Sequence, residues 1–178
     1  LADIVERLVK AGANINDNSG VLGLTPLVLA SQKGHVDVLD RLLSLGADIE
    51  AVGGDKMTAL MYACYHRKID IVDRLLEAGC NVNALDREET SALMWASQGG
   101  IVPIVDRLVV HGAKLNHQNK NGEDCLMKAS QNSRLEVVDR LLSLGCDVNA
   151  QDNKGMTPLM MACLTLDVSV VRLLLGHG

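Results

Sequence analysis

Apolar residues recur along this chain at the spacing of short amphipathic helices, which polar loops separate. Val38, Leu39, Leu42 and Leu43 illustrate the spacing of three or four residues that places side chains on one face of a helix. The pattern predicts helices over 1–9, 36–45, 69–78, 102–111, 135–144 and 168–177. A shorter apolar stretch precedes each of these helices after the first, so we expect helices in pairs.

A short motif marks the start of each shorter stretch and returns at a constant interval along the chain. It reads Thr25-Pro26-Leu27, Thr58-Ala59-Leu60, Ser91-Ala92-Leu93, Asp124-Cys125-Leu126 and Thr157-Pro158-Leu159. Thr, Ser and Asp are good N-caps, because their side-chain oxygen accepts a hydrogen bond from an amide of the first helical turn. The motif therefore predicts five helix starts.

Glycines form a second ladder with the same interval, except that its first step is slightly longer. Its members are Gly12, Gly46, Gly79, Gly112, Gly145 and Gly178. A glycine at this place ends a helix by adopting the left-handed conformation. Two ladders that share one period, of about 33 residues, indicate an array of stacked repeats.

The motifs resemble those of the ankyrin repeat family, and the resemblance covers the whole chain. It is carried by TPLVLA (25–30), TALMYA (58–63), TPLMMA (157–162), KGHVDVLDRLLSLGADI (33–49) and GCDVNAQD (145–152). The resemblance implies an all-α ankyrin-repeat solenoid, in which stacked helix-turn-helix units and β-hairpin-like fingers form a concave groove. We expect a single domain over 1–178, with a partial repeat at 1–16 and full repeats at about 17–49, 50–82, 83–115, 116–148 and 149–178.

Two positions depart from the family pattern. The family usually has His after Thr-Pro-Leu, and an apolar residue takes that place here: Val28, Met61, Met94, Met127 and Met160. We expect packing to hold the inner helices together at this position. The residue after a recurrent acid of the second helix is arginine, as in Asp106-Arg107, which predicts salt bridges between units. A convex binding strip for a charged partner is the alternative.

Composition and charge narrow the class of function. The net charge is −5 with no basic block, and the apolar runs are short, so we expect neither nucleic-acid binding nor membrane insertion. Five cysteines without a CxxC pair favour a reducing compartment, cytoplasmic or nuclear. All five replace small residues at positions expected to be packed. We find no catalytic or phosphate-binding motif and predict no enzyme, no cofactor and no metal; Cys64-Tyr65-His66 lacks a second pair of zinc ligands.

The aromatic residues are the best functional clue. The resemblance places the fourth residue after each cap in the groove, and Tyr65 lies one turn beyond Tyr62. Tyr and Trp are enriched at interface hot spots, although packing between helices is the alternative role. The predicted partner-binding residues are Leu29, Gln32, Lys33, Tyr62, Tyr65, His66, Trp95, Gln98, Lys128, Gln131, Asn132 and Met161. The predicted fingertip residues are Leu22, Leu24, Met57, Glu88 and Glu89. For the apolar ones, packing on the unit that follows is the alternative.

These features predict a protein–protein interaction module, an adaptor or scaffold, that holds an extended segment of another protein. We expect the chain alone to be monomeric. The alternative is a structural spacer or targeting segment of a larger multidomain protein. The start of the chain within a unit and the absence of a polar capping helix at its end favour a fragment of something longer.

Overall fold

The inner helix of each pair starts directly after a capping side chain. The computed structural model describes residues 2–177. The side chains of Thr25, Thr58, Ser91, Asp124 and Thr157 each accept a hydrogen bond from the backbone N–H three residues further on. The inner helices are α2 (Pro26–Lys33), α4 (Ala59–Tyr65), α6 (Ala92–Gly99), α8 (Cys125–Gln131) and α10 (Pro158–Thr165). The five predicted caps are confirmed.

The outer helices carry the amphipathic pattern. They are α1 (Ala2–Lys10), α3 (Val36–Ser44), α5 (Ile69–Glu77), α7 (Val102–Val110), α9 (Leu135–Ser143) and α11 (Val168–Leu175). The five from α3 onward begin at the predicted residue and end one or two residues earlier than predicted. The ladder glycine follows each of the first five outer helices with a positive φ, as at Gly46, where φ is 88°. Leu1 and Gly178 lie outside the described residues.

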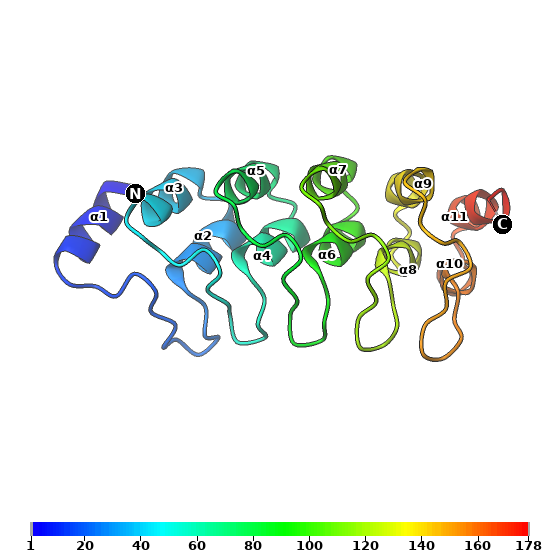
Figure 1. Ribbon diagram of the computed structural model, residues 1–178, viewed down its shortest axis with the longest axis horizontal. Helices are drawn as coiled ribbons and strands as arrows, with labels where there is room; N and C mark the ends of the chain where they lie inside the picture. Colours follow the sequence, from blue (N-terminus) through cyan, green and yellow to red (C-terminus); the bar gives the residue numbers. More distant parts are fainter. Residues whose placement is uncertain (1, 178) are drawn as a thin grey trace.

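The helix pairs stack in a single row (Figure 1). Inner helices pack against their neighbours in the row, so that α4 contacts α2 and α6, while α8 contacts α6 and α10. The outer helices line one side of the row, and the fingers project from the opposite side (Figure 1). Isolated β-bridges join Val52 to Thr58 and Leu85 to Ser91 within two fingers. The expected all-α solenoid is confirmed.

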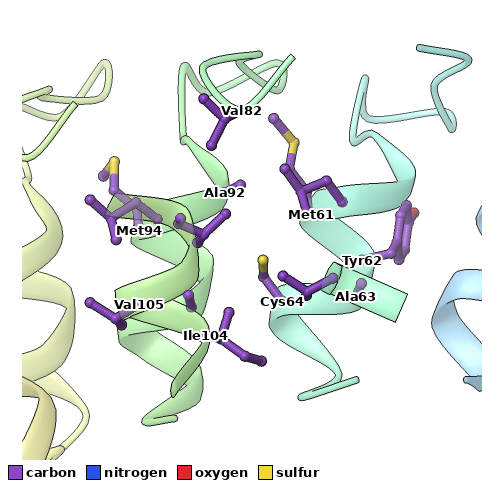
Figure 2. Close-up of a cluster of buried hydrophobic side chains, with 14 of the residues drawn as sticks. Met61, Tyr62, Ala63, Cys64, Val82, Ala92, Met94, Ile104 and Val105 are labelled. Atoms are coloured by element: carbon purple, nitrogen blue, oxygen red, sulfur yellow. The ribbon is translucent and has the colours of Figure 1, made fainter. Parts of the chain in front are cut away.

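An apolar residue at the third position after each cap seals the junction between units. Val28, Met61, Met94 and Met127 are at most 1% exposed. Figure 2 shows Met61 and Cys64 on the side of α4 that faces the α6/α7 pair. Met160, at the same position in the last pair, is 48% exposed, because no described helix covers that side of α10. The neighbouring unit therefore supplies the burial of this position.

The fingers are joined through their backbones. An N–H of each finger donates to a carbonyl oxygen of the finger before it: Gly54 to Leu22, Arg87 to Asp55, Lys120 to Glu88 and Asn153 to Asn121. The donors follow one another at the same interval as the caps. The fingers thus hold a fixed register along the row.

Salt bridges join neighbouring outer helices as the acid–arginine ladder predicts. Each arginine reaches the acid of the preceding unit: Arg41 contacts Glu6, Arg74 contacts Asp40 at 3.5 Å, Arg107 contacts Asp73, and Arg140 contacts Asp106 at 2.6 Å. Their side chains stay partly exposed, so each pair contributes only ~0–1 kcal/mol. The charged side chains of this ladder therefore pair with one another within the protein.

The junction residues allow a matched test of stacking. We predict that Met94→Ala lowers the free energy of unfolding by ~2–5 kcal/mol, because it leaves a cavity between α6 and its neighbours. Met160→Ala makes the same change at an exposed position and should cost under ~1 kcal/mol. Urea unfolding followed by circular dichroism measures both. Equal losses in the two variants would contradict burial by the neighbouring unit.

Candidate functional site

Tyr65, His66 and Trp95 form an aromatic cluster where α4 ends beside α6. The ring of Tyr65 meets that of Trp95 edge to face, with centroids 5.2 Å apart, and meets that of His66 in the same way at 5.0 Å. Contacts of this geometry contribute ~0.5–1.5 kcal/mol each. Tyr65 nevertheless stays 44% exposed. The cluster thus holds a large ring in a fixed orientation and leaves much of it open to a ligand.

Trp95 is anchored to the third finger. Its Nε1 donates a hydrogen bond to Asp86 Oδ2 at 3.1 Å. The other oxygen of this buried carboxylate accepts from the backbone N–H groups of Glu88 and Thr90. Asp86 therefore shapes the finger turn and fixes the indole, so the position of Trp95 depends on the finger as well as on α6.

His66 connects the cluster to the preceding unit. Its Nε2 lies 3.3 Å from Gln32 Nε2, an arrangement in which the amide donates to an unprotonated ring nitrogen. Burial lowers the pKa of His66, and the positive charges of Lys68 and Lys33 lower it further. The imidazole is therefore neutral at pH 7.

An open pocket of about 520 Å³ lies beside the cluster, at the turns between inner and outer helices. Its lining residues come from three successive units: Tyr65, His66, Arg67, Gln98, Gly99, Asn132 and Arg134. We call it the helix-turn pocket. It brings together four of the predicted partner-binding residues with two arginines.

Gly99 lines the pocket, and a second glycine, Gly100, follows it in the chain. Gly99 and Gly100 occupy the turn positions that His66 and Arg67 occupy one unit earlier. A side chain at Gly100 would force Arg134 to shift, because its Cβ would lie 2.5 Å from Cδ of Arg134, and the φ of 83° at Gly100 favours glycine. Arg134 crosses this glycine and donates from Nε to the Gln98 carbonyl oxygen at 2.9 Å. The bare backbone of α6 therefore separates two cationic side chains.

Several predicted partner-binding residues lie outside the helix-turn pocket. Tyr62 and Met161 are only 9% and 6% exposed, which leaves little of either side chain for a partner. Lys128 forms a salt bridge with Glu123 at 2.6 Å. Burial alone would raise the pKa of Glu123, but hydrogen bonds from Lys128 and Asn119 together with the charge of Lys128 hold it below its usual value. Leu29, Lys33 and Gln131 are exposed and do not line the helix-turn pocket.

The predicted fingertip set is divided. Leu22 is 70% exposed, and Glu88 and Glu89 are also exposed. Leu24 is half-buried. Met57 follows the packing alternative, because its side chain is 6% exposed and belongs to the hydrophobic core.

Sequence reasoning missed Arg67, Gly99 and Arg134. Their signal lies in a comparison of units: the turn positions 66 and 67 hold His-Arg, whereas 99 and 100 hold Gly-Gly. A second signal is the backbone of Arg67, whose φ of 59° belongs to the region that favours glycine.

The repeat seen in the structure agrees with a comparison of the sequence with protein families. Ankyrin repeats (3 copies) match over residues 1–86, 69–152 and 93–178. The chain belongs to the ankyrin repeat family. Ankyrin repeats generally serve as protein–protein interaction modules.

Curated relatives of this ankyrin-repeat chain share one of its stretches. The "Ankyrin repeat and SOCS box protein 6" of Mus musculus and that of Pongo abelii are both 44% identical over 62 residues. The protein of the same name from Homo sapiens is 42% identical over 62 residues. The stretch covers 34% of this chain and 15% of each relative.

The cysteines of the ankyrin units differ in exposure. Cys64, Cys125 and Cys146 are buried, and Cys80 is half-buried, as expected for residues that replace small packed ones. Cys163 is exposed, so the expectation of a packed position is wrong there; no described unit covers that side of α10. Burial raises the pKa of the Cys64 thiol and raises that of Cys80 to about 12.

Two further properties concern metals and membranes. Within residues 2–177, no group of three or more His, Cys, Asp or Glu side chains is placed to hold a metal ion. No helix in the described part of the chain has the length and apolar character needed to cross a bilayer.

Thiol reactivity tests this arrangement. We predict that Cys163 alone reacts rapidly with an aromatic disulfide reagent at pH 8, because thiolate formation is suppressed at Cys64, Cys80 and Cys125, and Cys146 is buried. Denaturant should release the remaining thiols. Cys163→Ser should abolish the fast phase, and a fast phase that survives in this variant would contradict the prediction.

Proposed function

We propose that this chain binds an extended segment of a partner protein along its inner helices, with Tyr65 and Trp95 as the main contacts. The observation that carries the proposal is the edge-to-face pair of these two rings, which lies beside an open pocket. Tyr and Trp supply large contact areas at a low cost in side-chain entropy, and both are enriched at interface hot spots.

The polar surroundings suit an extended backbone. The amides of Gln98 and Asn132 line the same pocket from two successive units. An extended segment exposes its own N–H and C=O groups, and side-chain amides can both donate to and accept from them. The fixed register of the fingers keeps the row rigid, which lowers the entropic cost of binding.

A second function has a specific observation in its favour. The curated relatives carry, by their names, a SOCS box besides ankyrin repeats, and the matched stretch is 15% of their length. A chain of this kind could be the targeting or spacer segment of a larger protein. As a spacer, the chain would select no peptide by itself.

The test begins with a display library of protein-derived peptides selected on the native chain. We predict that Tyr65→Ala with Trp95→Ala weakens the selected peptides by about 30-fold or more, the equivalent of losing a ~2 kcal/mol hot spot. Val110→Ala is the matched control, because Val110 is 83% exposed on the outer helix α7. It should leave affinity unchanged.

Loss of the Asp86 hydrogen bond could also disturb the fold, so Trp95→Phe is measured in parallel. This variant keeps an aromatic ring and loses the Nε1 donor. Thermal unfolding of each variant separates lost binding from lost structure. The proposal fails if the folded double variant binds the peptides as tightly as the native chain, or if no peptide is selected.

A further inference from the structure

The lining of the helix-turn pocket is positive on two sides. Arg67 approaches it from the unit before Gly99, and Arg134 from the unit after. His66, Gln98 and Asn132 add neutral polar groups. None of the described residues that line the pocket is an aspartate or a glutamate.

Neither arginine is neutralised inside the protein. The ion pairs found among residues 2–177 include neither Arg67 nor Arg134. Arg134 uses Nε for the Gln98 carbonyl, and no acceptor for its two terminal nitrogens is found in the described chain. Arg107 and Arg140 on the outer helices behave differently, since each is paired with an acid of the preceding unit. The pocket therefore contains guanidinium N–H groups that can still donate hydrogen bonds to a ligand.

The unit that contributes Gly99 to the pocket lacks an acid at the start of its outer helix. The second residue of the outer helix is Asp37, Asp70 and Glu136 in three of the units, but Pro103 in the unit that carries the two glycines. A guanidinium group presents planar, paired donors that match the oxygens of a carboxylate or a phosphate.

We propose that the helix-turn pocket binds an anionic group of the partner segment, a carboxylate or a phosphorylated side chain, between Arg67 and Arg134. This inference rests on the proposed function and names the chemistry of the partner. The segment places an apolar residue on Tyr65 and Trp95 and an acidic group a few residues away.

A peptide suits this pocket better than a nucleic acid. Nucleic-acid grooves neutralise a series of phosphates. Here two arginines flank a single hollow, Asp70 and Glu136 lie on the adjoining outer helices, and the chain carries a net charge of −5. The pocket accepts one anionic group.

Arg67→Gly gives a clean removal of charge. The backbone at Arg67 has a φ of 59°, and glycine already occupies the equivalent Gly34 and Gly100, so the variant should be at least as stable as the native chain. Its matched control is Lys56→Gly, which removes one positive charge from a fingertip residue with a φ of 63°. Thermal unfolding should show both variants folded.

The probes are short synthetic peptides with blocked ends, taken from the display selection. Three versions of each are compared: the acidic original, one with each Asp or Glu replaced by Asn or Gln, and one with phosphoserine at the acidic position. We expect Arg67→Gly and the amide version each to weaken binding by roughly 10- to 100-fold, the range for hydrogen bonds to charged groups. The two changes together should cost little more than either alone, and Lys56→Gly should have no effect.

The phosphoserine version identifies the source of the anion. Tighter binding than the carboxylate original assigns the pocket to phosphorylated segments, and equal or weaker binding assigns it to acidic ones. A charge exchange adds a positive readout: Arg67→Glu should recover affinity for a peptide that carries Lys at the acidic position.

Two results would overturn the inference. If peptides without acidic residues bind as tightly as the acidic ones, and Arg67→Gly does not change their affinity, the pocket does not select an anionic group. The proposed function then still stands, because peptides bind. If a single-stranded oligonucleotide displaces the peptide at equal concentration, the pocket is not specific for a peptide anion. Failure of the proposed function is distinguishable, because then no peptide is selected at all.

Discussion

The structure depends on the burial of each helix pair against the next one. Met61, Met94 and Met127 are closed off from solvent, whereas Met160 at the same position is half exposed, and the difference between them is the presence of a following unit. An array built in this way is a one-dimensional stack in which stability comes from the junctions. The common period, repeated in caps and finger hydrogen bonds, keeps these junctions equivalent.

Local chemistry explains why so much of the fold could be predicted. A cap such as Thr25 and a terminating glycine such as Gly46 act within a few residues, so the sequence alone locates the helix starts. The apolar ladder and the salt bridges between outer helices could be predicted from the sequence because their residues recur at one period. Cys163 was predicted wrongly, and the sequence left exposure and packing both open for Met57, because the exposure of a side chain depends on which neighbours surround it, and spacing does not reveal these.

The candidate site could be predicted only in part from the sequence, for the same reason. Positional equivalence treats Leu29 and Tyr62 alike, yet Leu29 is 42% exposed and Tyr62 is 9% exposed. The Tyr62 hydroxyl oxygen would lie 3.3 Å from a Cβ at Gly53, so this ring lies over the second finger and is covered by it. The pair of Tyr65 and Trp95 could be anticipated from helical spacing, but their edge-to-face contact with each other could not.

The pocket shows that the special chemistry of this chain lies where the repeat is broken. Every other full unit carries a side chain at the position equivalent to 99, and three of them have an acid at the position equivalent to 103. Gly99 and Pro103 replace both in the third unit. The outer arginines use the acids of the preceding units, so Arg67 and Arg134 keep their positive charge in a chain whose net charge is negative. Regularity therefore stabilises the row, and a local departure from regularity gives it a surface that can distinguish partners.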